Sequence, residues 1–460
     1  VSPAVVSINV TSRADPSALR RIPGFENFPF DLVPKGQQSP DGEEDAVPPQ
    51  GGRTEKGQPR LPPQQSSGSG FFISSDGYIV TNNHVVENAE SIKVVLKDER
   101  ELEATVVGRD EGTDLAVLKV KSGGGYPFVN FENAGKPRVG DWVITVGNPF
   151  GLGGTATAGI VSAYGRDIGE TFVDYIQIDA PINRGNSGGP TFDIYGRVIG
   201  VNTAIFSPTG GSVGIGFAIP AEVADAVTKQ LMSGGKIARG YIGATIQNFT
   251  ADMAEAQGMG EQRGAIVADL VPGGPSQRAG LQPGDVVVAI NGTSVRTSSE
   301  LTREVAKAHP GDPLRLDVVR DGKRRVVEVR SGTRPSERDL AANDNTPGQR
   351  GPGGQPVPPV HSPAVIGLAL VPLDDATRRQ LNLPADVRGA AVTAVDQSSD
   401  AGQKGLRRGD VIVRAGDRMV ASAADLAAAV EVAKKAGRAS ILVGIYRNGR
   451  TTFLPLNVSG

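Results

Sequence analysis

The second half of the chain contains two copies of one pattern, and this repeat limits the folds open to the whole chain. Seven residues of the first copy return 125 positions later: Gly264, Gly280, Leu281, Gly284, Asp285, Leu301 and Val305 recur as Gly389, Gly405, Leu406, Gly409, Asp410, Leu426 and Val430. Two copies are too few for a solenoid, which needs several stacked units. We therefore expect a tandem pair of modules of about 95 residues each.

The rest of the chain has room for one further domain. A chain of 460 residues is expected to hold three domains, because a typical domain has roughly 100 to 200 residues. We predict one domain over residues 1–233, the first module over 234–335 and the second over 364–460. Residues 336–363 are rich in proline and glycine and predict a linker without a core.

Short strands dominate the predicted secondary structure of the first domain. Abundant glycine and proline, 61 and 33 residues, with 5% aromatic residues favour strands and turns over long helices. A helix is first indicated at 221–232, and residues 12–69 predict a long mobile loop. The strand spacing predicts a closed barrel or a sandwich, with strands at 5–10, 91–96, 115–120, 142–146 and 198–202.

Composition excludes several classes of function. With 48 basic and 50 acidic side chains the net charge is −2, so neither nucleic acid nor an acidic membrane is an expected partner. No apolar run is long enough to span a bilayer, and we expect a soluble chain with peptide or protein partners. The absence of cysteine excludes disulfides and thiol catalysis. The chain begins at Val1 and not at a methionine, as expected after removal of a leader.

Ser187 is the strongest candidate for a catalytic nucleophile. It lies in the sequence GNSGGP (185–190), in which glycines permit a tight turn. Such a turn can direct the hydroxyl and the backbone N–H groups of Gly185 and Ser187 at one point, so that nucleophile and oxyanion hole share a loop. His84 is the only histidine of the β-rich domain and therefore the only candidate base there. A lone histidine is more often structural, but the glycine-flanked serine reverses that preference.

Two aspartates compete for the role of the acid that orients His84. Asp114 directly precedes the apolar run 115–120, and Asp110 lies four residues earlier. We predict that Asp114 is the more buried and stabilises the imidazolium, and that Asp110 is an ordinary turn residue. The order His84, Asp114, Ser187, with separations of 30 and 73 residues, is that of chymotrypsin-like enzymes and not that of subtilisins or α/β-hydrolases.

Six segments resemble, in order, the signature segments of the HtrA/Deg (protease Do) serine endopeptidases. They are GSGF (68–71), TNNHVV (81–86), TDLAVLK (113–119), VGNPFGL (146–152), APINRGNSGGP (180–190) and GIGFAIP (214–220). The resemblance implies a mainly-β chain, in which a chymotrypsin-like double β-barrel with its triad between the barrels precedes two α+β PDZ domains. It also implies an ATP-independent periplasmic endopeptidase that degrades unfolded or damaged proteins under stress. Such an enzyme needs no cofactor or metal and forms homotrimers or multiples of trimers.

The same resemblance implies a substrate pocket and a regulatory residue. The pocket residues are Ile182, Ala204 and Ile205, and branched apolar walls accept Val, Ile, Leu or Ala but reject charge. A neutral Asn186 cannot make the ion pair by which chymotrypsin-like zymogens are activated, so we expect activation by loop ordering. Arg166 is the residue that resembles the family's transmitter of this ordering; the alternative is a solvated arginine without such a role.

Both modules open on a segment that resembles the carboxylate-binding loop of PDZ domains, RGYIGA (239–244) and AVIGLA (364–369). In the first, backbone N–H groups would hold the carboxylate of a hydrophobic C terminus, and the next strand would pair with the peptide. The alternative is that these are ordinary core positions. In the second module Pro372 removes a strand donor, so peptide binding there stays open. The loop residues of the first module are Tyr241, Ile242, Gly243 and Ala244.

Two other functions remain as alternatives. The chain could hold unfolded proteins as a chaperone without cutting them, although an intact set of catalytic residues disfavours this as the sole role. It could also be a regulatory protease that cuts one partner, which two PDZ modules and no visible membrane anchor disfavour.

Overall fold

The computed structural model describes residues 2–12, 64–121, 123–132, 134–148, 154–168, 172–183, 185–208, 211–235, 237–335, 340, 365–381, 383–385 and 387–458. The chain divides into two compact units, Val1–Ile237 and Ala238–Gly460. The predicted linker, apart from residue 340, lies outside the described residues. Each unit is considered by itself below.

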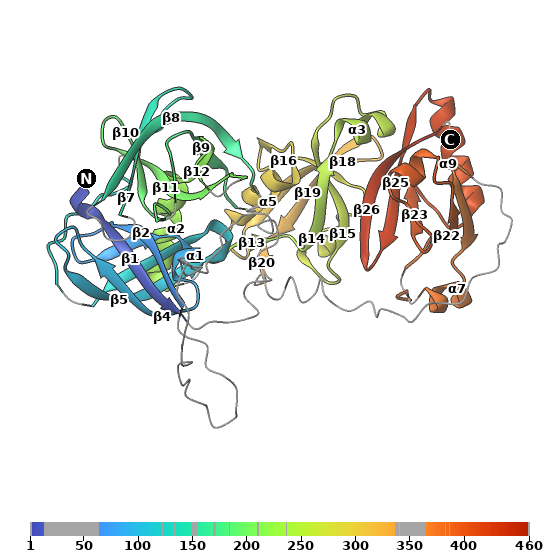
Figure 1. The fold of residues 1–460 in the computed structure, drawn as a ribbon. Coiled ribbons are helices and arrows are strands. Elements are labelled where there is room, and N and C mark those ends of the chain that lie inside the picture. The colour runs from blue at the N-terminus through green and yellow to red at the C-terminus, as the bar shows by residue number, and fades with distance from the viewer. Residues whose placement is uncertain are drawn as a thin grey trace, which may run out of the picture. The chain divides into compact units, whose positions relative to one another are not determined.

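Two closed six-stranded barrels form the first unit, which confirms the predicted double barrel (Figure 1). The strand order is β1-β2-β3-β6-β5-β4 in the first barrel and β10-β11-β12-β9-β8-β7 in the second. The first barrel has β1 (Val5–Ser12), β2 (Gln64–Phe72), β3 (Tyr78–Thr81), β4 (Ala89–Val95), β5 (Glu101–Asp110) and β6 (Leu115–Val120). The second has β7 (Trp142–Gly147), β8 (Thr155–Arg166), β9 (Tyr175–Ile178), β10 (Pro190–Asp193), β11 (Val198–Ile205) and β12 (Gly216–Pro220).

Short helices and one longer helix complete the first unit. They are η1 (Ser2–Ala4), α1 (Asn83–Val86), η3 (Glu111–Thr113) and α2 (Ala221–Gly234). Helix α2 follows Pro220, is capped by Gly235 in the left-handed conformation (φ 68°), and packs on β5, β6 and β11. It ends one residue beyond the predicted end of the first domain.

The predicted loop over residues 12–69 is wrong at both ends. Ser12 is the last residue of β1, and β2 begins at Gln64. The register pairs Ser12 with Gln64 and Val5 with Phe71, so β2 is antiparallel to β1 along the whole length of β1. Pairing with an apolar strand therefore gives strand structure to the polar residues 64–69, which have little strand preference of their own. The remaining residues of the predicted loop, 13–63, lie outside the described part.

A buried apolar cluster joins the two barrels and thereby fixes the geometry between them. It combines side chains of the first barrel, among them Phe71 and Leu115, with side chains of the second, among them Tyr175, Val201 and Phe217. Residues of α2 complete the cluster. The rigidity of a close-packed core therefore extends across the junction at which the candidate catalytic residues lie.

The second unit contains two sheets with the same strand order, which confirms the internal repeat. The first repeat has β13 (Gly240–Tyr241), β14 (Ala244–Phe249), β15 (Gly264–Leu270), β16 (Val286–Ile290), β17 (Thr293–Ser294), β18 (Pro313–Arg320), β19 (Lys323–Arg330) and β20 (Gly332–Thr333), with α3 (Ala251–Gln257), α4 (Pro275–Arg278) and α5 (Ser298–Ala306). The second has β21 (Leu368–Pro372), β22 (Ala390–Val395), β23 (Val411–Ala415), β24 (Arg418–Met419), β25 (Ser440–Arg447) and β26 (Arg450–Asn457), with α7 (Asp375–Gln380), α8 (Asp400–Gln403) and α9 (Ala423–Lys435).

The repeated aspartate has the same structural role in both copies. Asp285 binds the guanidinium of Arg320 through both carboxylate oxygens, and Asp410 binds Arg447 in the same way. Each arginine also donates to the carbonyl of the repeated glycine, Gly280 or Gly405. The hydrogen bonds that Arg320 donates to Asp285 raise its pKa, and those that Arg447 donates to Asp410 raise the pKa of Arg447. The sequence repeat thus preserves a buried ion pair as well as a backbone.

Candidate active site

His84 and Asp114 are brought together by the turn that joins β5 to β6. Asp114 follows η3 in the left-handed conformation (φ 54°) and His84 lies on α1, directly after β3. The His84 Nδ1 atom lies 2.8 Å from Asp114 Oδ2, and the backbone N–H of His84 donates to Asp114 Oδ1 at 3.0 Å. A carboxylate only accepts hydrogen bonds, so Nδ1 carries the proton and Nε2 is left as the base.

The environment of the pair is asymmetric in a way that suits acid–base chemistry. The side chain of His84 is 49% exposed, whereas that of Asp114 is 14% exposed. The carbonyl oxygen of Asp114 accepts hydrogen bonds from the backbone N–H of Asn83 at 3.1 Å and from Asn82 Nδ2 at 3.0 Å. Asn82 and Asn83 therefore fix the backbone of Asp114, and His84 contacts its carboxylate. The imidazole of His84 faces the solvent from which substrate would arrive.

Asp110 differs from the prediction. It is 7% exposed and accepts a hydrogen bond from the hydroxyl of Thr113. Asp114 is less buried than Asp110, so the expectation that Asp114 is the more buried of the two is wrong. Contact with His84, and not depth of burial, is the property that singles out Asp114.

Thr203, on β11 of the second barrel, links the candidate acid to the candidate nucleophile. Its hydroxyl donates to Asp114 Oδ2 at 2.6 Å, and its carbonyl oxygen accepts a hydrogen bond from the hydroxyl of Ser187 at 3.1 Å. A hydroxyl carries one proton, so its transfer to His84 requires the side chain of Ser187 to rotate away from Thr203. Such tightening of catalytic hydrogen bonds on substrate binding is common in enzymes without a ligand.

Residues 185–189, the nucleophile loop, turn tightly because three of them are glycines. Gly185 and Gly188 have φ angles of 96° and 85°, which L side chains rarely adopt. The N–H of Gly188 donates to the carbonyl of Asn202 at 2.8 Å, and that of Gly189 to the carbonyl of Asn186 at 3.0 Å. The side chain of Asn186 is 4% exposed, and its Oδ1 atom has no hydrogen-bond partner among the described residues.

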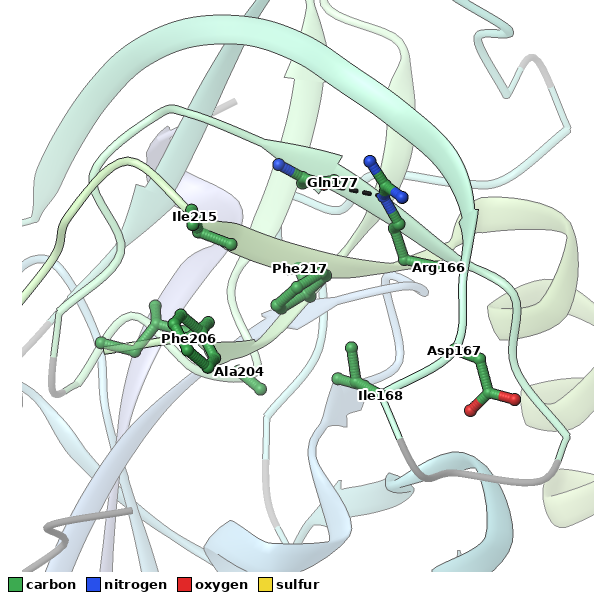
Figure 2. A pocket seen from close by; sticks show the side chains of 9 residues that line it. Arg166, Asp167, Ile168, Gln177, Ala204, Phe206, Ile215 and Phe217 are labelled. Carbon is green, nitrogen blue, oxygen red and sulfur yellow. Dashed lines mark hydrogen bonds between the residues drawn. The ribbon is translucent and has the colours of Figure 1, made fainter. Parts of the chain in front are cut away.

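A hollow of about 390 Å³ is lined by residues of β8, β9, β11 and β12 and by their neighbours (Figure 2). Two of the three residues predicted to form the substrate pocket, Ala204 and Ile205, are among its lining residues, and Ile182 is not. Ile182 is buried with Ile205 in the core of the second barrel. Arg166 lines the rim and donates from Nε to Gln177 Oε1 at 2.9 Å (Figure 2). The full lining is Arg166, Asp167, Ile168, Gln177, Ala204, Ile205, Phe206, Ile215 and Phe217.

In the second unit, the predicted carboxylate loop lies between β13 and the edge strand β14. Gly243 has a φ angle of 69°, and its carbonyl oxygen accepts from the N–H of Val271 at 2.9 Å. The carbonyl of Ile242 accepts from the N–H of Ser276 at 2.8 Å, and the Ile242 side chain is buried. Ala244 opens β14, which packs on α5. Burial raises the pKa of Tyr241, which is therefore a neutral phenol at physiological pH.

The described residues offer neither a cluster of metal ligands nor a helix suited to a membrane. They contain no group of three or more acidic, histidine or cysteine residues that could hold a metal ion. Among them there is also no helix with the length and apolar character needed to cross a membrane.

Comparison with known proteins agrees with this geometry. The model of the trypsin-like peptidase domain matches residues 68–201, and that of the PDZ domain matches residues 240–330 and 364–458. A protein of Brucella suis biovar 1 (strain 1330) named "Probable periplasmic serine endoprotease DegP-like" is 42% identical over 100% of this chain and 88% of its own. A protein of the same name from Rhizobium meliloti (strain 1021) is 41% identical over 100% of this chain and 90% of its own.

The chain belongs to the HtrA/Deg family of serine endopeptidases.

Solved structures of HtrA-type proteases are also similar to this member of the family. The HtrA-type protease AlgW with a decapeptide is 35% identical, has a TM-score of 0.56, and covers 73% of this chain and 97% of its own. The same protease with a tripeptide is 35% identical, has a TM-score of 0.58, and covers 74% of this chain and 96% of its own.

Several residues of the HtrA/Deg site escaped the analysis of the sequence. Thr203 lies near the end of β11, after Asn202, where nothing local marks it as a partner of Asp114. Phe206 could have been found, because it directly follows the predicted pocket residues Ala204 and Ile205. Phe217 lines the hollow because β12 pairs with β11 in a register that sets it opposite Ala204.

The two aspartates near His84 should differ sharply when each is changed to asparagine. Asp114→Asn should lower kcat by about 10⁴-fold, because an amide beside Nδ1 favours the wrong histidine tautomer. Asp110→Asn should leave kcat near the parent value, since its hydrogen bond goes to Thr113. Steady-state hydrolysis of a fluorogenic peptide measures both. Equal losses would show that the roles of the two acids are wrongly divided.

Proposed function

We propose that this endopeptidase performs protein quality control, cutting unfolded or damaged proteins without ATP, with His84, Asp114 and Ser187 as its catalytic triad. The observation that carries the proposal is the pair of hydrogen bonds made by Thr203, which join Asp114 and Ser187 across the two barrels. The full-length relatives are named as periplasmic enzymes, and the compartment of this chain is the periplasm.

In the proposed reaction, Ser187 Oγ attacks the carbonyl carbon of the scissile peptide bond. His84 Nε2 takes the hydroxyl proton as general base, and Asp114 stabilises the imidazolium that forms. The N–H groups of Gly185 and Ser187 stabilise the negative charge on the carbonyl oxygen of the tetrahedral intermediate. His84 then gives its proton to the leaving amine, and a water molecule hydrolyses the acyl-enzyme by the same steps.

The apolar hollow supports cleavage after aliphatic side chains. Six of its nine lining residues are apolar, among them Ala204, Ile205 and Phe217, and a charged group placed against these six would be left unpaired at a cost. Selection among aliphatic side chains should be modest, because one methylene is worth about 1 to 3 kcal/mol in such a pocket. Unfolded proteins expose such side chains in many sequences, which fits a broad substrate range.

Self-association into trimers, or multiples of trimers, is also proposed. The outer surface of the second barrel exposes large apolar side chains next to one another in the fold. Trp142 on β7 is 61% exposed and Tyr195, in the turn between β10 and β11, is 77% exposed. Strands β7 and β10 are paired, so the two residues share one region of the barrel. Exposed apolar regions of this kind are typical of protein interfaces.

Replacement of Ser187 tests the nucleophile. Ser187→Ala should reduce the cleavage of unfolded casein by a factor on the order of 10⁶, because the members of a triad act as a unit. The fold should survive, since among the described residues the Ser187 hydroxyl donates one hydrogen bond, to the carbonyl oxygen of Thr203. Thermal unfolding of the variant serves as the control. A purified variant that still cuts casein at a rate comparable with the parent would end the serine mechanism.

The first PDZ domain is proposed to sense hydrophobic C termini and to raise protease activity. A peptide can shift a conformational equilibrium only by its difference in affinity for the two states. A coupling free energy of about 1 to 3 kcal/mol would change activity roughly 5-fold to 150-fold. Arg166 is proposed to transmit the signal, because it contacts Gln177 at the rim of the substrate hollow.

Amidation of the activating peptide gives the cleanest test of this sensor. A hydrophobic peptide with a free C-terminal carboxylate should raise the cleavage of a second substrate to a plateau, and its amidated form should raise it far less, because the loop loses a charged acceptor. Arg166→Ala should lower the stimulated rate while peptide still binds. Substitution of Ile242 by a charged residue is a poorer test, since this side chain is buried in the domain core. Binding without any change in rate would reduce the domain to a substrate tether.

A further inference from the structure

Ser69 forms an unusual set of hydrogen bonds between the two barrels. It lies on β2 of the first barrel and is fully buried. Its backbone N–H donates to the carbonyl of Ser187 at 2.8 Å, and its hydroxyl donates to the carbonyl of Gly185. The same hydroxyl accepts a hydrogen bond from the backbone N–H of Asn148 at 2.8 Å. One residue of the first barrel thus holds the nucleophile loop of the second at two points.

These two points lie on either side of Asn186, in the part of the loop whose N–H groups must face the oxyanion. Gly185, at a φ angle of 96°, lacks the Cβ atom that restricts rotation of the neighbouring peptide groups in other residues. The hydroxyl of Ser69 fixes the direction of the carbonyl of Gly185. The backbone N–H of Ser69 fixes the carbonyl of Ser187, two residues further along the loop. With both carbonyls fixed, the single peptide group between them, which carries the N–H of Ser187, has little freedom to rotate.

Close packing supports the same position of the loop. A Cβ atom on Gly188 would lie 2.1 Å from the carbonyl oxygen of Ser69 and 2.5 Å from Thr81 Oγ1. The carbonyl of Ser69 is itself held by the hydroxyl of Thr81 at 2.8 Å. The loop therefore lies directly against Ser69 without intervening side-chain atoms, so a small movement at Ser69 reaches the loop.

The hydroxyl of Ser69 also connects the loop to the segment that follows β7. Asn148, which donates its N–H to this hydroxyl, is buried, and its Oδ1 atom accepts from the N–H of Gly154 at 3.1 Å. A serine hydroxyl can donate one hydrogen bond and accept two, so it satisfies the carbonyl of Gly185 and the N–H of Asn148 at once. Alanine at this position would leave both backbone groups buried and unpaired.

We propose that the hydroxyl of Ser69 is a positioning group for the oxyanion hole. It holds the nucleophile loop in the conformation that directs the N–H groups of Gly185 and Ser187 at the substrate carbonyl oxygen. Ser69 does not touch the reacting atoms, and its effect passes through the loop. The inference rests on the proposed catalytic role of Ser187 and adds to it a residue that acts from the other barrel.

The chain offers a matched control on the neighbouring strand. Ser7 on β1 is paired with Ser69 on β2 and is also fully buried. Its hydroxyl has no hydrogen-bond partner in the described part of the chain. Removal of the Ser7 hydroxyl therefore reports the effect of a lost buried hydroxyl in this sheet without any effect on the nucleophile loop.

The experiment compares Ser69→Ala with Ser7→Ala in the full-length protein. Hydrolysis of a fluorogenic peptide gives kcat and KM, and inhibition by a peptide boronic acid reports binding of a tetrahedral adduct. Ser69→Ala should lower kcat about 10²-fold to 10³-fold, the loss seen when one oxyanion donor is removed. Its KM should stay close to that of the parent, and boronic acid affinity should fall in parallel with kcat/KM. Ser7→Ala should leave all three near the parent values.

A second variant guards against a simple loss of stability. Ser69→Cys nearly preserves the volume of the side chain but makes weaker hydrogen bonds, so its kcat should also fall while its melting temperature stays near that of the parent. Unchanged kcat in Ser69→Ala, or losses that follow melting temperature equally in the Ser69 and Ser7 variants, would overturn the proposal. If Ser187→Ala instead retained the activity of the parent, the proposed triad would be wrong. The failure of the triad and the failure of the Ser69 proposal are therefore distinguishable.

Discussion

The proposed catalytic site depends on hydrogen bonds that cross from one β-barrel to the other. His84 and Asp114 belong to the first barrel and Ser187 to the second, so neither barrel holds the complete proposed triad. Thr203 reaches from the second barrel to Asp114, and Ser69 reaches from the first to the nucleophile loop. The shared apolar cluster fixes the position of one barrel against the other. The polar contacts of Thr203 and Ser69 then set the positions of the proposed catalytic groups.

The nucleophile loop suits the activation by loop ordering that is proposed for this chain. Asn186 is buried and neutral, so it cannot make the ion pair that orders the nucleophile loop of chymotrypsin-like enzymes. The loop is instead held by backbone hydrogen bonds, and the Ser187 hydroxyl donates to Thr203. Among the described residues, one hydrogen bond holds the Ser187 hydroxyl in this orientation, so a modest difference in binding energy is enough to shift it. The first PDZ domain, with its proposed role as a sensor of peptides, would be a source of such energy.

Local patterns predicted much of this structure, and the failures have a common physical cause. Strand β6 begins and ends at the predicted residues because all of its residues except Lys119 are apolar, and the repeat was visible because glycines at positive φ tolerate few replacements. The strand character of residues 64–69 and the role of Thr203 arise only when distant segments pair. Asp110 and Asp114 could not be ranked by burial, since both adjoin the same strand and only the folded turn decides which one faces His84.

The most direct test of the central claim is the site of covalent modification by diisopropyl fluorophosphate. After reaction in the presence of an activating peptide, proteolytic digestion and mass spectrometry should locate one adduct per chain on Ser187, and loss of casein cleavage should follow its formation. His84→Ala should not form the adduct, because Ser187 then lacks its base. Complete inactivation with Ser187 unmodified, or an adduct on a different serine, would contradict the account.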